Sequence, residues 1–234
     1  MSGAAFAVNP AAEAVLRRVG REGVPLLLID DVLADPDAAR EVAVAAPFGP
    51  PLSAWYPGVN APVPDAYRQA LLPALRASLA RAFGTPADAQ LAIMSFFALS
   101  TRRAEELAPR QRIPHYDQPD PNMLALVHYL APDQGGGTGF FRHDATGFET
   151  ISPARRDAYR AAADAELAAH GDALTGFAGP DTPGFTLTGA VEARYNRLIV
   201  YPACALHCAL FDGARLSPDP RTGRLTANSF IRAV

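Results

Sequence analysis

The sequence contains no lysine, and all 21 of its basic residues are arginine. Without an ε-amino group the chain cannot form a Schiff base with an aldehyde or a pyridoxal cofactor, and it has no P-loop lysine to hold a phosphate. An anionic ligand must therefore be bound by arginine, by hydroxyl groups or by backbone amides. The absence of lysine together with abundant alanine is typical of a high-GC bacterial genome.

Cysteine is also scarce, because Cys204 and Cys208 are the only two in 234 residues. One such pair is too small for a structural zinc site, and a disulfide is not expected in a reducing compartment. The net charge of −3 and the lack of a basic run give no reason to expect a nucleic-acid partner.

Long apolar runs are missing as well. The N-terminus lacks the basic region and apolar stretch of a signal peptide, and no run approaches the roughly 18–20 residues of a membrane helix. We therefore expect a cytoplasmic protein without a membrane partner. The length and the 49% hydrophobic content favour one domain over residues 1–234 with a single core.

Local patterns divide the chain into a supporting part, residues 1–90, and a β-rich core, residues 91–234. The supporting part predicts helices at 10–20, 35–46 and 65–83, a strand at 24–29 and a structured loop at 47–64. In the core, short strands separated by turn residues indicate a sandwich or barrel, interrupted by a partly helical insertion at 150–184. These strands are predicted at 91–99, 112–116, 123–130, 138–142, 185–193, 197–201 and 224–231.

The strongest chemical pattern is His115-Tyr116-Asp117. Residues two apart on an extended segment point to the same side, so this histidine and this aspartate can share one metal ion. His207, which follows the apolar run 198–201, is the best-placed third ligand. Two imidazoles and one carboxylate on one face of an octahedron leave open positions for a chelating cosubstrate and O2, as in non-haem Fe(II) oxygenases.

Such tripeptides arise by chance, and the order of the following features is more informative. A glycine-rich stretch, Gly-Gly-Gly-Thr-Gly-Phe at 135–140, precedes His207, and Gly223-Arg224 opens the last predicted strand. This order resembles the prolyl-4-hydroxylase-like branch of the Fe(II)/2-oxoglutarate-dependent oxygenases. Residues 91–234 carry the resemblance. The run 28–33 resembles the lead-in of that family, and the run 56–62 resembles a group of uncharacterised bacterial relatives.

The resemblance implies an α+β protein with a mainly β core, a double-stranded β-helix of the jelly-roll, cupin-like type. It implies that His115, Asp117 and His207 are the catalytic Fe(II) ligands, and that Arg224 binds the far carboxylate of 2-oxoglutarate. Arginine suits this role because its planar fork binds a carboxylate through two hydrogen bonds. Thr226 and Tyr129 are candidates for further cosubstrate contacts, while Arg215 and Arg221 stay open as alternative anchors.

The activity implied by the resemblance is that of a dioxygenase that uses O2 and 2-oxoglutarate and releases succinate and CO2. A carboxylate at Asp117, where a glycine or alanine would leave room for a halide, favours hydroxylation or a related oxidation. The substrate is a small molecule, an amino acid or a peptide side chain, and we expect the loops 47–64 and 150–184 to select it. A homodimer stays open.

Two other classes of function remain open. One is a cupin-like metal-binding or sensory protein without oxygenase turnover, which would have no need of the Arg224 anchor. The other is a zinc hydrolase on the same ligands, with Asp120 as its general base. A serine hydrolase is disfavoured because the G-x-S-x-G motif is absent.

The remaining histidines and two loop aromatics have less specific readings. His128 alternates with apolar residues and is predicted to lie in the core or at its rim, whereas His143 is a candidate substrate contact or replacement ligand. His170 suits the C-terminal end of a helix. Trp55 and Tyr56 either pack the loop 47–64 against the protein or line the substrate entrance.

Overall fold

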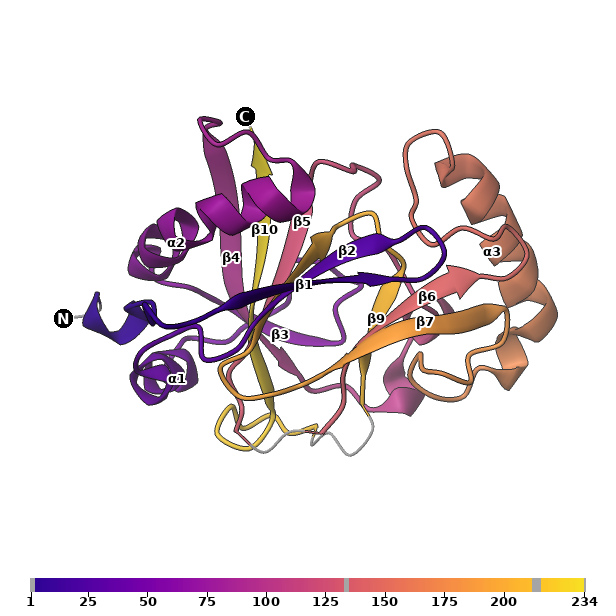
Figure 1. The fold of residues 1–234 in the computed structure, drawn as a ribbon. Helices are drawn as coiled ribbons and strands as arrows, with labels where there is room; N and C mark the ends of the chain where they lie inside the picture. Colours follow the sequence, from indigo (N-terminus) through magenta and orange to yellow (C-terminus); the bar gives the residue numbers. More distant parts are fainter. Residues whose placement is uncertain (1–2, 133–134, 212–215, 234) are drawn as a thin grey trace.

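Two antiparallel sheets and three α-helices make up the computed structural model, which describes residues 3–132, 135–211 and 216–233 (Figure 1). Within these residues one sheet has seven strands in the order β1-β2-β8-β5-β10-β4-β3, and the other has three in the order β7-β6-β9. The helices are α1 (Pro36–Val44), α2 (Asp65–Phe83) and α3 (Arg156–His170). The strands are β1 (Ala14–Val19), β2 (Val24–Ile29), β3 (Gly58–Pro62), β4 (Leu91–Ser100), β5 (Leu124–Tyr129), β6 (Gly137–His143), β7 (Phe185–Glu192), β8 (Leu198–Pro202), β9 (His207–Leu210) and β10 (Arg224–Ala233).

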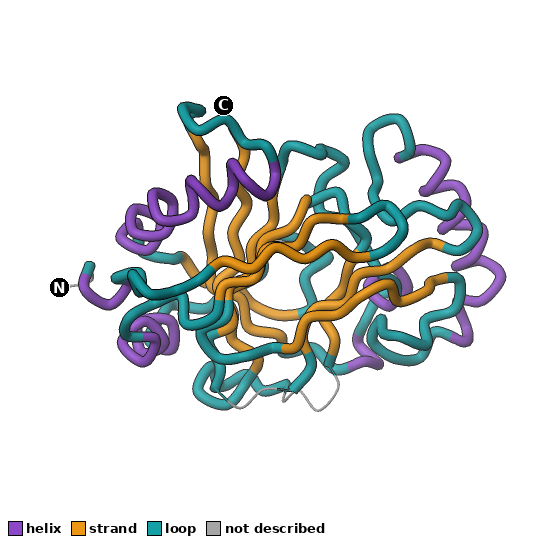
Figure 2. The backbone as a smooth tube through the Cα atoms, viewed as in Figure 1, coloured by secondary structure: helices purple, strands orange, loops and turns teal. Residues whose placement is uncertain are grey.

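The elements form four layers, with α1 and α2 at one side, the two sheets in the middle and α3 at the other side (Figures 1 and 2). The outer face of the seven-stranded sheet packs against α1 and α2, while its inner face packs against the three-stranded sheet. The far side of the three-stranded sheet packs against α3.

Side chains along β10 alternate between the two faces of the seven-stranded sheet, so this strand contributes to the packing on both faces. Leu225, Ala227 and Ile231 belong to the outer cluster that contains the buried face of α2. Phe230 contacts the inner cluster instead, and Arg224 lies an even number of residues away on the same inner face. The predicted cosubstrate residues of β10 therefore lie on the inner face of this sheet.

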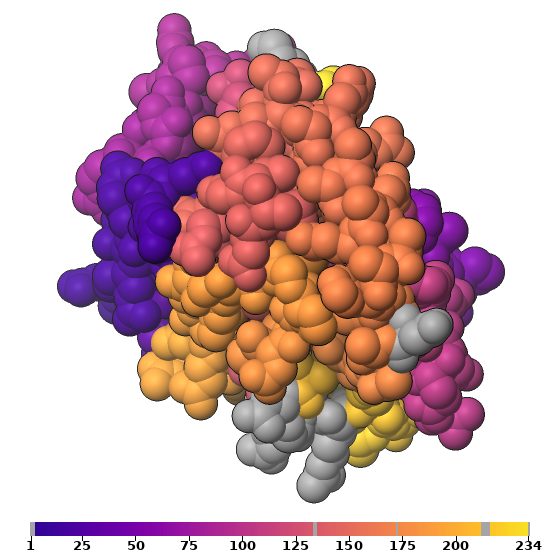
Figure 3. Space-filling view, turned by 90° about the vertical axis from the view of Figure 1, so that its right-hand side faces the viewer, coloured from indigo at the N-terminus to yellow at the C-terminus, as the bar shows by residue number. Residues whose placement is uncertain are grey.

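Residues 10–20 are not the predicted helix. They contain β1, which forms a hairpin with β2 in which Val19 pairs with Val24. The turn is fixed from outside, because the Glu149 carboxylate accepts hydrogen bonds from the backbone amides of Arg21 (2.9 Å) and Glu22 (2.8 Å). Gly20 has a φ of 69°, and a Cβ atom there would lie 2.1 Å from the Glu149 carboxylate. Long-range pairing therefore overrides the weak helical spacing. In Figure 3 the hairpin lies beside the residues that precede α3.

The segment 112–116 is not a strand either. It follows a short 3-10 helix, Pro109–Arg112, and makes one isolated antiparallel bridge, between His115 and His207. Pro114 has no N–H to contribute to a ladder, so pairing stops after a single residue.

The helix predicted at 35–46 is confirmed as α1, where the Asp35 side chain accepts a hydrogen bond from the Ala38 amide at 3.0 Å. In the described part of the chain, no helix is long and apolar enough to cross a membrane.

His128 lies in the core, as predicted. It is fully buried between the seven-stranded sheet and α2. Its Nδ1 lies 3.2 Å from the Tyr67 hydroxyl, and its Nε2 lies 3.2 Å from Oδ1 of Asn196. Burial lowers the pKa of His128 to about 4, partly offset by the Asn196 hydrogen bond. The ring therefore stays neutral in the folded protein over a pH range in which an unfolded chain would protonate it.

This difference predicts a pH-dependent stability. Between pH 6.5 and 4 the unfolded chain protonates His128 and the folded protein does not, so the free energy of unfolding falls as the pH falls. The loss attributable to this residue reaches about 2 kcal/mol by pH 5. His128→Gln removes that part of the slope, although it lowers stability at pH 7 by breaking buried hydrogen bonds. Denaturant unfolding at pH 7 and pH 5 measures the difference, and parallel losses in both proteins would contradict the prediction.

Candidate metal centre

The structure brings together the three ligand residues predicted from the sequence. His207 begins β9, and its backbone pairs with that of His115 through N–H···O bonds of 2.9 and 2.7 Å. The amide of Asp117 donates to the carbonyl of Ala203 at 2.9 Å. These backbone bonds hold the loop that carries His115 and Asp117 against the chain that leads into β9.

The three side chains point to a common centre. Nε2 of His115 lies 3.8 Å from one carboxylate oxygen of Asp117, and Nε2 of His207 lies 3.6 Å from the other. One ligand atom from each residue lies within 4.8 Å of the others. Ligands at about 2.1 Å from a transition metal are roughly 3 Å apart, so small side-chain rotations would complete such a site.

The protonation states also suit a cation. His207 Nδ1 lies 2.9 Å from the carbonyl oxygen of Ala205, which can only accept, so Nδ1 carries the proton and Nε2 offers its lone pair. Burial lowers the pKa of His207 to about 4 and keeps the ring neutral. Burial raises the pKa of Asp117 to about 6, and the neighbouring His115 opposes that rise. The carboxylate would gain its missing positive partner from a bound metal ion.

The centre is open on one side. The side chain of His115 is 53% exposed, whereas those of Asp117 and His207 are 21% and 7% exposed. A ligand can therefore approach from the His115 edge, while the opposite edge is closed by the protein.

A buried cation lies on the inner face of the seven-stranded sheet. Arg224 is 4% exposed, and its guanidinium carbon lies 5.8 Å from the ring centre of Tyr129 and 5.5 Å from that of Phe211. Its Nη2 donates to the carbonyl of Gly137 at 3.3 Å, while its buried Nε has no partner. Among the described residues no carboxylate pairs with Arg224. An unpaired buried charge is costly, so this position suits an anionic ligand.

The other predicted cosubstrate residues surround Arg224. The hydroxyl of Tyr129 lies 2.7 Å from that of Thr138, and Thr226 is the direct cross-strand neighbour of Tyr129. Thr226 is fully buried, and its hydroxyl donates to the carbonyl of Ala98 at 3.5 Å. The Tyr56 hydroxyl lies 3.2 Å from that of Ser100, which ties the loop 47–64 to the sheet, whereas Trp55 is exposed.

Arg221 and Arg215 are the two arginines that the sequence left open as alternative anchors. Arg221 lies at the surface, where its guanidinium pairs with Glu41 at 3.3 Å. Arg215 lies outside the described residues. The glycine-rich stretch has a steric role beside Arg224, because Gly136 has a φ of 82° and a Cβ atom there would lie 2.0 Å from the Leu210 carbonyl oxygen.

Tyr201 is a site residue that sequence reasoning missed. Its ring centre lies 4.8 Å from that of His207. Burial raises the pKa of Tyr201, with a further rise from the Asp117 carboxylate and an opposing effect of Arg224. The ring belongs to the same buried cluster as Tyr129, beside which Arg224 lies, and so connects the two parts of the site. Side-chain alternation along the predicted strand 197–201 could have indicated this role, because Tyr201 precedes His207 by an even number of residues.

His143 does not take part in this centre, contrary to one of its predicted roles. It is buried on the α3 side of the three-stranded sheet, with Nε2 2.9 Å from the Glu166 carboxylate and Nδ1 2.8 Å from the Thr146 hydroxyl. On the same side, the Tyr159 hydroxyl of α3 donates to the carbonyl of Pro114 at 3.3 Å. The inserted helix therefore supports the segment that carries His115.

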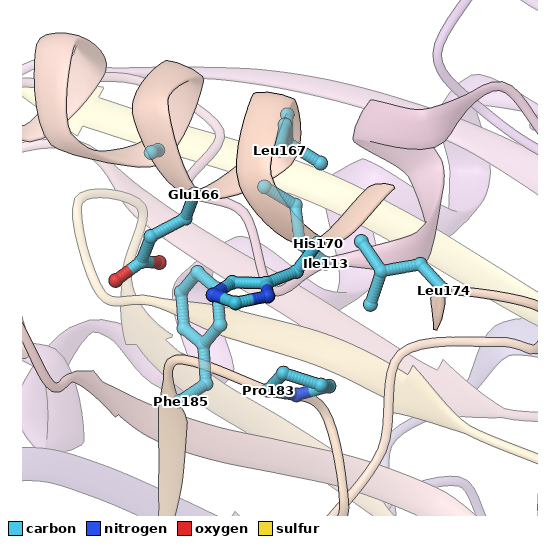
Figure 4. Close-up of a pocket in the computed structure, with 8 residues that line it drawn as sticks. Ile113, Glu166, Leu167, His170, Leu174, Pro183 and Phe185 are labelled. Atoms are coloured by element: carbon cyan, nitrogen blue, oxygen red, sulfur yellow. The ribbon is translucent and has the colours of Figure 1, made fainter. Parts of the chain in front are cut away.

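A small hollow under α3 belongs to this packing and not to the metal centre. Figure 4 shows the ring of His170 between Phe185, Pro183 and Leu174. The hollow is lined by Ile113, Ala163, Glu166, Leu167, His170, Leu174, Pro183 and Phe185. Several of these side chains form the apolar cluster behind the three-stranded sheet, so the hollow has a wall of strands between it and His207.

The fold therefore consists of two facing antiparallel sheets, and a histidine–carboxylate–histidine cluster that could hold a metal ion lies between them. The model of a family of unknown function, DUF6445, matches residues 10–231, and the chain belongs to this family. No curated protein matches the sequence.

Solved structures share the fold at low sequence identity. HygX from Streptomyces hygroscopicus, crystallised with nickel and 2-oxoglutarate, is 13% identical with a TM-score of 0.53, and the match covers 91% of this chain and 84% of that one. SnoN, a non-haem α-ketoglutarate-dependent epimerase from nogalamycin biosynthesis, is 14% identical with a TM-score of 0.50, covering 89% and 77%. A second HygX structure contains hygromycin B as well. At these identities the likeness shows the fold alone.

The geometry predicts one divalent ion per chain. His207→Ala removes a neutral imidazole whose lone pair points to the centre, and we expect it to weaken binding of Ni(II) or Co(II) at least about 100-fold. Isothermal titration of the metal-free protein measures the stoichiometry and the affinity. His170→Ala, an exposed histidine on α3, is the matched control and should bind as the wild type does. Equal binding by both variants would place the metal elsewhere.

Proposed function

We propose that this chain is a non-haem Fe(II)/2-oxoglutarate-dependent dioxygenase that hydroxylates a small molecule, an amino acid or a peptide side chain. His115, Asp117 and His207 would hold Fe(II), and Arg224 would bind the far carboxylate of 2-oxoglutarate, with Tyr129 and Thr226 beside it. On this proposal the two-sheet fold is a double-stranded β-helix. The likeness in fold to HygX and SnoN supports the proposal.

The observation that carries the proposal is the buried Arg224, which has no carboxylate partner among the described residues. It lies on the inner face of the seven-stranded sheet, and that face packs against the three-stranded sheet that carries His207. A protein that only bound a metal would have no use for a second, desolvated cation in the same space. Tyr201, whose ring lies 4.8 Å from that of His207, and Tyr129, whose ring lies beside Arg224, belong to one buried cluster, which supports a shared interior for the two charges. A dicarboxylate that reaches from Arg224 to a metal on Asp117 would neutralise the buried guanidinium and complete the metal's coordination.

When bound, iron and 2-oxoglutarate supply an oxidant from O2 that attacks an unactivated C–H bond, with succinate and CO2 as coproducts. The chain contributes the surroundings of that chemistry. The neutral imidazoles of His115 and His207 donate lone pairs, and Asp117 contributes one negative charge. Tyr201 and Phe140 pack beside His207 with ring centres 5.1 Å apart and exclude water from the closed side.

A zinc hydrolase on the same ligands is less well supported. Its candidate general base was Asp120, but one carboxylate oxygen of Asp120 accepts a hydrogen bond from the Asn122 amide at 2.9 Å. This bond gives the residue a structural role in the turn before β5.

The role of Arg224 predicts a selective loss of cosubstrate affinity. Arg224→Ala should raise the Kd for 2-oxoglutarate about 10- to 100-fold, because it removes a charge-assisted hydrogen-bond pair, and should leave the metal stoichiometry unchanged. Titration of 2-oxoglutarate into the Ni(II)-loaded protein measures both. The exposed Arg221→Ala is the control, and equal affinity of the Arg224→Ala variant and the wild type would refute the anchor.

Turnover supplies the test of the activity itself. The Fe(II)-loaded protein should form succinate from 2-oxoglutarate only when O2 is present, and Arg224→Ala should slow this at limiting cosubstrate. Succinate formation that is independent of O2, or unaffected by His207→Ala, would contradict the proposed function.

A further inference from the structure

An apolar surface lies next to the metal centre on the inner face of the seven-stranded sheet. Its members come from three adjacent strands, since β10 pairs with both β4 and β5. Phe230 is opposite Met94, and Asn228 is opposite both Phe96 and Val127. We call this surface the entrance cup. It consists of Met94, Phe96, Met123, Val127, Asn228 and Phe230.

The entrance cup is a more exposed part of the inner face. Further along the same sheet, β2 and β8 bury Leu26, Leu28 and Ile199 against the three-stranded sheet. In the cup, by contrast, Met94 is 53% exposed and the two phenylalanines are only half-buried. Apolar side chains gathered at an opening mark a binding surface more often than isolated exposed ones do.

The cup adjoins the proposed iron ligands and not the proposed cosubstrate anchor. The Asp117 amide donates to the carbonyl of Ala203, and the Ala203 amide donates to the carbonyl of Met123 at 2.8 Å. The ligand loop is therefore attached to the start of β5, at the edge of the cup. Along β10, Asn228 stands four residues from Arg224, which is about 13 Å in an extended strand. A dicarboxylate held by Arg224 and the metal leaves this region free.

Asn228 determines which polar group of a ligand the cup can bind. Its Oδ1 is buried and has no hydrogen-bond partner among the described residues. The neighbouring Ser229, which faces the other way, has its partner in Ser95 at 2.7 Å. An unsatisfied buried acceptor costs about 1–3 kcal/mol, and a ligand N–H or O–H group would remove that cost.

Charge further restricts what can bind. None of the six residues that form the cup is ionisable. On the same face of β10 the nearest charged side chains are four residues from Asn228 on either side, the buried Arg224 and the exposed Arg232 near the end of the strand. A charged group placed in the cup would lose its hydration without a partner, so a neutral group is favoured there.

We propose that the entrance cup binds a neutral, apolar ring or branched group of the substrate and that Asn228 Oδ1 accepts a hydrogen bond from a single N–H or O–H on that group. This inference rests on the proposed function, because it takes the cup to be where the oxidised group lies. It favours a neutral ring-bearing small molecule over the charged end of a free amino acid.

The test compares two probes, indole, which has a ring N–H, and 1-methylindole, in which a methyl group replaces that hydrogen; the Asn228 variants separate the loss of the donor from the added methyl group. Both are titrated into the protein loaded with Ni(II) and 2-oxoglutarate, and binding is followed by ligand-observed NMR, which requires no turnover. The wild type should bind indole about 5- to 10-fold more tightly than 1-methylindole. Asn228→Leu should abolish this preference, and Asn228→Gln, which keeps a neutral amide acceptor, should retain it. Ser229→Ala, on the opposite face of the same strand, is the matched control and should behave as the wild type.

Equal affinity of the two probes for the wild type, or a preference that survives Asn228→Leu, would overturn the inference. Failure of both probes to bind while Ni(II) and 2-oxoglutarate still bind would overturn it too and leave the proposed function intact. Conversely, an indole preference that depends on Asn228 in a protein that does not bind 2-oxoglutarate would support the cup and refute the dioxygenase.

Discussion

The two backbone hydrogen bonds between His115 and His207 join two segments that are distant in the sequence, and the candidate site depends on them. They place the loop that carries Asp117 beside the start of β9, so that two imidazoles and one carboxylate share a centre. Several surrounding features serve this contact. Gly136 permits the close approach of the chain to Leu210 at the end of β9, and α3 holds the carbonyl of Pro114 through Tyr159. The insertion between β6 and β7 therefore has a structural function as well as any role in specificity.

Two opposite charges face the interior between the sheets, and neither has an oppositely charged partner among the described residues. The Asp117 carboxylate stands at the ligand cluster with only neutral imidazoles beside it, and Arg224 stands among aromatic rings. Such an arrangement is unfavourable in an empty protein and becomes favourable when a cation and a dicarboxylate bind together. The rest of this interior is apolar, which strengthens these electrostatic interactions. The entrance cup lies beside it.

Sequence patterns predicted the features that depend on local chemistry or on motif order. Asp35 with Pro36 located the start of α1, and the order of His115, Asp117, His207 and Arg224 located the residues that the structure gathers between the sheets. Residues 10–20 were predicted wrongly, because β1 is determined by pairing with β2 and by the distant Glu149.

The residues that sequence reasoning missed have roles that only tertiary contacts create. In the sequence Tyr201 is an ordinary apolar strand residue, and its ring contact with His207 follows from how β8 of one sheet and β9 of the other come together. Asn228 likewise reads as one polar residue in the last strand. Its unpaired oxygen is visible only when the neighbouring strands are in place.

The central claim is that one metal ion and one 2-oxoglutarate bind together between the sheets. Anaerobic addition of Fe(II) and 2-oxoglutarate tests this directly through the visible absorption spectrum. The wild type should show a metal-to-ligand charge-transfer band that depends on both additions, and His207→Ala should show none. Absence of the band in the wild type, or its persistence in His207→Ala, would contradict joint binding at this site.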